Sequence, residues 1–278
     1  MLFRRLFLCA LFVGVLVGLF DSAVQRWRVV PLIFAAEVFE SSNAAPAADH
    51  AHAAGAEAHS HGAAAWEPEA GFERTAYTVL ANVLNATGLA LLLLPLVAFV
   101  NRQRAGLALQ KSRGAVVGQG LLWGVAIWLC LFGLPALGQA PVLPGMQAAP
   151  LQARQLWWAL AAASSAGGLA VLYFVPSLWR VLGLGLLALP FAVGAPLAVG
   201  SAFAGMSAEV APQMQALAAQ FVVATSVASA LQCLLLGALC ALLAARWINP
   251  LLRPTLSPPL SRDAKNTTQP TATAGSTP

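Results

Sequence analysis

All four histidines of the chain lie in one short segment that is rich in alanine and glycine. They form two His-x-His pairs, and an acidic residue lies close to each pair. In an extended segment residues i and i+2 point to the same side, so each pair offers two imidazoles in one direction. Imidazole suits first-row divalent ions such as cobalt, nickel, copper and zinc, and carboxylates add charge compensation. The predicted metal ligands in this segment are His50, His52, His59, His61, Asp49 and Glu57.

The small residues between the two pairs, which include Gly55, allow four imidazole nitrogens to converge but do not force them to. We expect transient binding without strict selectivity, because the affinity order of divalent ions favours copper, nickel and zinc over cobalt at nitrogen sites. Imidazole binds metal only when it is neutral, so binding should weaken as the pH falls below about 6.5. A low-complexity linker that contains histidine without binding metal is the alternative.

The stretch that precedes the histidines, PLIFAAEVFE, places Glu37 and Glu40 three residues apart on one face of a short amphipathic segment. Such a segment suits the membrane surface. We predict that Glu37 and Glu40 are further metal ligands, which pass a cation from the histidines to the rest of the protein. Simple anchoring of this segment at the membrane surface is the alternative.

The composition is that of a polytopic membrane protein. Hydrophobic residues make up 59% of the 278 residues and charged residues only 9%, which excludes an ordinary soluble protein. The net charge of +5 does not indicate a nucleic-acid partner, because the basic residues lie at the ends of apolar runs and form no patch with interleaved aromatics. The four cysteines also lie inside apolar runs, where they suit packing and not a disulfide framework.

A helix needs about 20 apolar residues to cross a hydrocarbon core of about 30 Å. Windows of this kind predict an all-α membrane protein, a bundle of six transmembrane helices. The predicted spans are roughly 6–24, 77–100, 114–138, 156–178, 181–203 and 220–245. The predicted organisation is a transmembrane domain over 1–249, an extracytoplasmic histidine-rich loop over about 37–74, and a disordered tail over 250–278 that is rich in proline, threonine and serine.

The distribution of lysine and arginine predicts the orientation of these spans. With both termini in the cytoplasm, 11 of the 15 basic residues face inward and nine of the ten acidic residues face outward. Arg4 and Arg5 precede the first span as in a signal peptide, but no small-x-small cleavage site follows its apolar run. We therefore expect the first span to remain as an uncleaved helix.

Small residues predict where the helices approach closely, either within the bundle or at a dimer seam. They are Gly14, Gly18, Gly114, Gly118, Gly120, Gly124 and the stretch 163–168. In the fifth span, Pro190 and the sequence Gly194-Ala195-Pro196 predict an interruption, which either lines a pathway or is a packing kink.

The predicted spans hold few polar groups in their middle parts. No ionisable residue lies in the middle of any span, so the sequence predicts no intramembrane relay. Asn82 and Asn85, three residues apart on one face of the second span, offer either interhelical hydrogen bonds or carbonyl oxygens along an ion path.

Several stretches together resemble one bacterial family, the CbtA family of proposed cobalt transporter subunits. The matching stretches are MLFRRLFLCALFVGVLVGLF, PLIFAAEVFE, the histidine-rich loop, WEPEAGFERTAYTVLANVL, LPGMQAAPLQARQLWW and LALPFAVGAP. The resemblance covers residues 1 to about 249 and omits the tail. One departure concerns the fifth span, where the family pattern has a histidine just before Gly-Ala-Pro and this chain has Phe191 and Ala192.

The resemblance implies cobalt uptake across the bacterial inner membrane for cobalamin synthesis, with a small single-span companion protein that also carries histidine. Cobalt would be the transported substrate, and nickel or zinc are the other candidates. No phosphate-cradling Gly-rich motif with lysine occurs, so any use of ATP belongs to a partner. The main alternative is a non-transporting accessory protein that buffers or senses metal. An enzyme is not expected, because no exposed nucleophile accompanies a base. Membrane lipid is the other expected partner, and a homo-oligomer is a further option.

Overall fold

The computed structural model describes residues 2–43, 68–69, 71–103 and 112–252. Within these ranges the secondary structure is helical and contains no strand, which confirms the all-α prediction. The elements are α1 (Leu2–Arg28), α2 (Val30–Asn43), α3 (Phe72–Gln103), α4 (Arg113–Trp128), η2 (Leu129–Gly133), α5 (Leu134–Gly138), α6 (Leu151–Phe174), η3 (Ser177–Trp179), α7 (Arg180–Val193), α8 (Val210–Leu243), η4 (Ala244–Ile248) and α9 (Asn249–Leu252).

Five helical stretches in the described part of the chain are long and apolar enough to cross a membrane. They are Leu2–Arg28, Phe72–Gln103, Arg113–Gly138, Leu151–Phe174 and Val210–Leu252. Each contains one of the predicted spans or most of it, but the helices continue past the apolar windows because charged and polar residues outside the hydrocarbon core can still be helical. These helices confirm the prediction of a multi-pass membrane protein.

The remaining predicted span, 181–203, is not a full-length helix. The helix α7 covers only Arg180–Val193 and ends at Gly194, whose φ of 85° lies in the left-handed region. The following proline, Pro196, has no N–H to continue the ladder and disfavours helical geometry at Ala195. The predicted interruption at Gly194 therefore ends the helix, and the count of six membrane-crossing helices stays a prediction.

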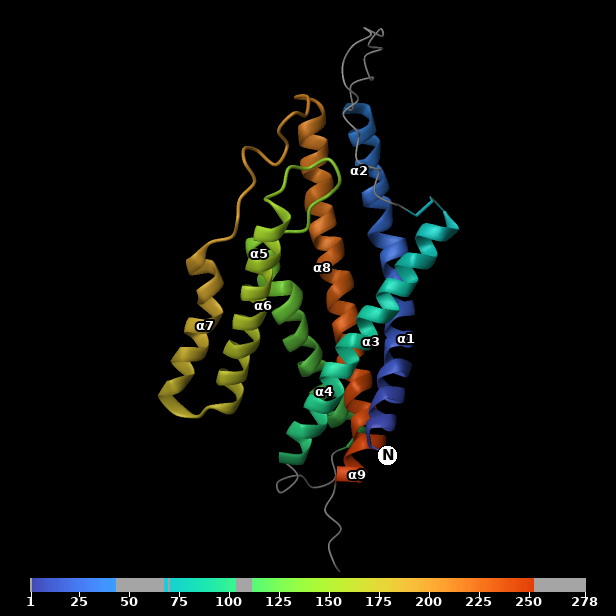
Figure 1. Ribbon diagram of the computed structural model, residues 1–278, viewed down its shortest axis with the longest axis vertical. Helices are drawn as coiled ribbons and strands as arrows, with labels where there is room; N and C mark the ends of the chain where they lie inside the picture. The colour runs from blue at the N-terminus through green and yellow to red at the C-terminus, as the bar shows by residue number, and fades with distance from the viewer. Residues whose placement is uncertain (1, 44–67, 70, 104–111, 253–278) are drawn as a thin grey trace, which may run out of the picture.

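The chain runs up and down between two ends of the bundle (Figure 1). The start of α1 and the short helix α9 lie at the lower end in this view, whereas α2 and the beginning of α8 lie at the upper end. The two ends of the described chain thus lie on the same side of the bundle. That this side faces the cytoplasm remains a prediction from the basic residues.

The helix α2 continues upward from α1 and does not lie flat across the bundle (Figure 1). Together the two helices span 2–43, which at about 1.5 Å per residue is roughly twice the thickness of a hydrocarbon core. One face of α2 buries Ala36, and the helix contacts α8. The expected amphipathic segment is therefore helical, but it projects from the bundle along α8.

Glycines allow the helix backbones to approach closely. A Cβ atom on Gly18 would lie 2.5 Å from Cα of Val83 in α3, and one on Gly120 would lie 2.6 Å from the carbonyl oxygen of Gly237 in α8. Gly14, Gly124 and Gly168 also pack against backbone or side chains of neighbouring helices. The prediction of helix packing within the bundle is confirmed at these positions. Gly114 and Gly118 instead face open space within this chain.

Buried apolar side chains form two clusters. The lower cluster joins α1, α3 and the second half of α8 with η4, and its core contains Val13, Val17, Leu93, Leu94 and Leu236. The upper cluster joins α2, the first half of α8 and the loop after α5, and its core contains Val29, Ala36, Leu143, Met214 and Phe221. The bundle is thus held together at two levels along α1, α2 and α8.

The glycine contacts between α4 and α8 lead to a prediction with a control on the same helix. Gly120→Ala should lower the midpoint of thermal unfolding, because the new methyl group meets backbone atoms of Gly237 and Ala238 and overpacking costs about 1–3 kcal/mol. Gly118→Ala should leave the midpoint unchanged or raise it, because its Cβ meets nothing within 4 Å and alanine favours helix over glycine by about 1 kcal/mol. Thermal unfolding of the detergent-purified protein tests both. Equal effects of the two variants would contradict this packing.

Candidate functional site

Most of the predicted metal ligands lie outside the residues that the structure describes. They are His50, His52, His59, His61, Asp49 and Glu57. Glu40 belongs to the last turn of α2, and Glu37 lies one turn earlier. Within the described ranges no group of three or more His, Cys, Asp or Glu side chains gathers as a metal site. Metal binding by the histidine-rich segment therefore stays a prediction.

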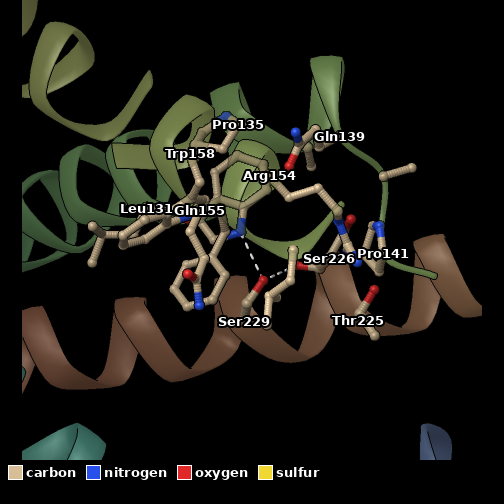
Figure 2. A pocket seen from close by; sticks show the side chains of 15 residues that line it. Leu131, Pro135, Gln139, Pro141, Arg154, Gln155, Trp158, Thr225, Ser226 and Ser229 are labelled. Atoms are coloured by element: carbon tan, nitrogen blue, oxygen red, sulfur yellow. Dashed lines mark hydrogen bonds between the residues drawn. The ribbon is translucent and has the colours of Figure 1, made fainter. Parts of the chain in front are cut away.

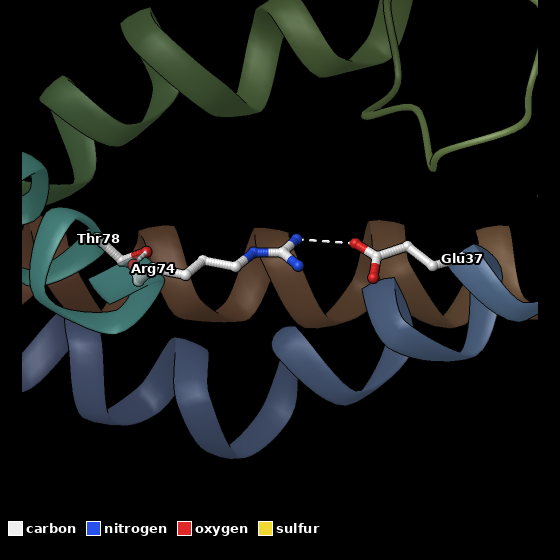
Figure 3. Close-up of polar contacts among 3 residues, drawn as sticks. All are labelled: Glu37, Arg74 and Thr78. Carbon is white, nitrogen blue, oxygen red and sulfur yellow. Dashed lines mark hydrogen bonds and ion pairs between the residues drawn. The ribbon is translucent and has the colours of Figure 1, made fainter. Parts of the chain in front are cut away.

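Glu37 forms an ion pair with Arg74 in the first turn of α3 (Figure 3). The distance from Arg74 Nη2 to Glu37 Oε1 is 2.7 Å. The guanidinium carbon of Arg74 also lies 5.2 Å from the ring centre of Phe34, so the arginine packs on an aromatic ring of α2 as well. These contacts join α2, which precedes the histidine-rich segment in the chain, to α3, which follows it. A cation that reached Glu37 would have to compete with the guanidinium for its carboxylate.

We expect the ion pair to position α2 against α3 and to add little stability. The Arg74 and Glu37 side chains are 40% and 36% exposed, and ion pairs in contact with water contribute about 0–1 kcal/mol. A double-mutant cycle with Glu37→Gln and Arg74→Gln, followed by chemical unfolding, should therefore give a coupling free energy in this range. A coupling of several kcal/mol would show that the pair is a main support of the fold.

Asp21 is a buried acid inside α1 that the sequence analysis did not single out. It lies in the last third of α1, which continues without a break to Arg28. The Asp21 side chain is only 3% exposed. Its Oδ2 accepts a hydrogen bond of 2.7 Å from Nε2 of Gln25, one turn further along the helix. In the described part of the chain, no lysine or arginine forms an ion pair with it.

The neighbouring Ser22 connects α1 to α3. Its hydroxyl donates to the carbonyl of Gly18 at 2.7 Å and accepts a hydrogen bond of 3.0 Å from Nδ2 of Asn82. Asn85, which the sequence analysis paired with Asn82, is exposed. Only Asn82 of the predicted asparagine pair therefore turns toward α1. It acts there through an interhelical hydrogen bond, one of the two roles considered for it.

The helix α8 adds a third buried polar side chain at a comparable level. Gln232 is 3% exposed, and its Nε2 has no hydrogen-bond partner among the described residues. Along α8 it lies between Ala228 of the upper cluster and Leu236 of the lower cluster.

Asp21 and Ser22 on α1 have a similar position, because they follow Val17 of the lower cluster and precede Val29 of the upper one. A polar layer thus separates the two apolar clusters, and we define it as Asp21, Ser22, Gln25, Asn82 and Gln232.

A polar strip on α3 connects the Glu37–Arg74 pair with this layer. Arg74, Thr78 and Asn82 are spaced by four residues, so they share one face of the helix. Arg74 binds Glu37 of α2, and Asn82 binds Ser22 of α1. Thr78 lies between them, with its hydroxyl bonded to the carbonyl of Arg74 at 2.8 Å (Figure 3). The strip leads from the Glu37–Arg74 pair toward the buried carboxylate.

The sequence contained a signal for part of this site. The spacing of Arg74, Thr78 and Asn82 is visible in it, and so is the position of Asp21 between apolar residues and Gln25. What the sequence lacks is the partner of each group, because α1, α3 and α8 are far apart along the chain. The carboxylate is held in a protein interior where an ionisable group is costly, and such groups commonly mark ion pathways.

Comparison with known proteins gives the family. Searches of the curated proteins and of the solved structures found no match to the chain. One family model, described as "Probable cobalt transporter subunit (CbtA)", matches residues 3–245, which includes every helix that packs around the polar layer. The match confirms the resemblance seen in the sequence and indicates a multi-pass membrane protein that transports cobalt together with at least one other subunit. The chain belongs to the CbtA family, whose members are described as probable cobalt transporter subunits.

Proposed function

We propose that this chain is the membrane-embedded subunit of a cobalt uptake system in the bacterial inner membrane. In this proposal the histidine-rich segment faces the outside, captures divalent cobalt and delivers it to the helix bundle. The family match and the five membrane-length helices support the assignment to transport. The observation that supports a path through the bundle is the burial of the Asp21 carboxylate without a basic partner among the described residues.

The proposed path begins at the imidazoles of His50, His52, His59 and His61, with Asp49 and Glu57 as neighbouring carboxylates. Glu37 and Glu40 at the end of α2 form the next step, and Arg74 competes there for Glu37. The strip of Thr78 and Asn82 then leads to Asp21. Each step exchanges one set of oxygen or nitrogen ligands for another, which lets the cation move without losing all its coordination.

The polar layer offers oxygen ligands around one negative charge. Asp21 supplies the carboxylate, Ser22 a hydroxyl, and Gln25, Asn82 and Gln232 their amide oxygens. Such ligands suit a partly hydrated divalent ion. Below the layer, the lower apolar cluster fills the space between α1, α3 and α8. Further passage therefore requires the helices to move or the partner subunit to take part, and the partner that we expect is a small single-span protein with histidine.

We expect Asp21→Asn to reduce cobalt uptake by about tenfold or more, because loss of groups that support metal ligands already costs 10–100-fold and Asp21 would be a ligand itself. The asparagine keeps the size of the side chain and an oxygen that can accept from Gln25. Glu209→Gln, which changes an exposed acid next to α8, is the matched control. Uptake of labelled cobalt by cells, normalised to the amount of protein in the membrane, measures both variants. Normal uptake with Asp21→Asn would remove Asp21 from the path.

The capture step is tested with a variant in which His50, His52, His59 and His61 are all changed to alanine. It should need more cobalt for half-maximal uptake, whereas the rate at saturating cobalt should stay near that of the wild type. At low cobalt, uptake by the wild type should decrease when the pH drops below about 6.5, because imidazole becomes protonated there. Uptake by the variant should not depend on pH in this way.

The control for this experiment is Asp49→Asn with Glu57→Gln, which keeps the imidazoles and should therefore keep the pH dependence. Deletion of the whole gene separates transport from metal buffering. If deletion leaves cobalt uptake unchanged, the chain is an accessory protein and not part of the uptake system. If the histidine variant behaves as the wild type at low cobalt, the segment does not capture the ion.

A further inference from the structure

A cavity of about 330 Å³ lies in a different part of the bundle from the polar layer. Its walls come from the end of α4 with η2 and α5, from the first turns of α6 and from the middle of α8. Figure 2 shows Arg154 and Gln139 on one side of it and the hydroxyl-bearing residues of α8 on the other. These are Thr225, Ser226 and Ser229. The proposed cobalt path uses none of these residues.

The charge of the cavity wall is positive. Arg154 is half-buried and is the only charged residue among the described residues that line the cavity. Within the described ranges it has no carboxylate partner. The cavity also adjoins the amino end of α6, where Leu151 is a wall residue and no side chain caps the helix. The free N–H groups and the helix dipole add positive potential at this end.

A second donor in the cavity wall lacks a partner. The Nε2 atom of Gln139 is buried and makes no hydrogen bond to any described residue. An unpaired buried donor costs free energy, so a bound acceptor would stabilise this arrangement. The indole N–H groups of the two tryptophans are already used, because Trp128 donates to Ser229 Oγ and Trp158 donates to the carbonyl of Leu131, both at 3.1 Å.

The mouth of the cavity is apolar and open to the surroundings of the bundle. Leu151 is 67% exposed and Trp158 44% exposed, and Leu131 and Phe132 continue the apolar wall. On a membrane protein such exposed side chains meet lipid, and tryptophan favours the level of the headgroups. The cavity therefore combines donors and a positive charge inside with an acyl-chain environment at its mouth.

We propose that this cavity binds the phosphate group of an anionic membrane phospholipid. The guanidinium of Arg154 supplies the counter-charge, and Gln139 Nε2 donates a further hydrogen bond. Arginine suits phosphate because its planar group can donate two hydrogen bonds to two phosphate oxygens. The acyl chains lie against Leu151 and Trp158. A transported cation would be repelled by Arg154, so the site is separate from the proposed path.

The test uses the purified full chain in detergent and measures bound lipid by native mass spectrometry. Phosphatidylglycerol should bind more tightly than phosphatidylcholine, and Arg154→Gln should weaken phosphatidylglycerol binding by about tenfold or more, because hydrogen bonds to a charged group contribute about 1.5–3 kcal/mol. Arg28→Gln removes an exposed arginine at the upper end of α1 and should leave the binding unchanged. Arg154→Lys, which keeps the charge, should retain part of the affinity.

Two further experiments test whether the bound phosphate must belong to a lipid and whether a loss of binding could come from misfolding. Inorganic phosphate should not displace phosphatidylglycerol, because it lacks the acyl chains that contact the mouth. If Arg154→Gln unfolds, Gln139→Met keeps the size of the side chain without the donor and should also weaken binding. Equal binding of the two lipids, unchanged binding in a folded Arg154→Gln protein, or full displacement by inorganic phosphate would each overturn the proposal.

Discussion

The close approach of helix backbones at glycine is the constraint on which the rest of the bundle depends. Lipid tails are as apolar as leucine, so burial from water does not drive helices together inside a membrane, and tight packing must do so. Gly120, Gly124 and Gly237 bring α4 against α8, while Gly14 and Gly18 bring α1 against α3. Because α1 also contacts α8, the contacts of Gly14 and Gly18 hold α3 close to the helix that carries Asp21 and Ser22.

The polar layer shows what this close packing permits. Asp21 and Gln232 are each only 3% exposed, and a buried ionisable or unpaired group costs free energy that the apolar clusters on both sides must offset. An apolar residue that fitted the same space would avoid this cost. The position of the carboxylate at the end of a polar strip from α2 and α3 gives a physical reason to keep it, since a cation needs charge along its path.

The sequence predicts local features of this structure better than contacts between helices. Apolar windows locate the membrane-length helices, and Gly194 with Pro196 predicts the end of α7, because hydrophobicity and backbone sterics act within one segment. Gly118 and Gly120 look alike in the sequence, yet only Gly120 meets another helix. The burial of Asp21 depends on Asn82 and on α8, and the Glu37–Arg74 pair joins residues 37 apart. No local pattern specifies such partners.

The two proposed sites have opposite charge and lie on different helix interfaces. Asp21 lies where α1 meets α3 and α8, whereas Arg154 lies where α6 and η2 meet the middle of α8. Charges in a low-dielectric interior act over longer distances than charges in water, so an arginine close to the cation path would oppose transport. Separation by α8 lets one bundle hold a cation on one side and a lipid phosphate on the other.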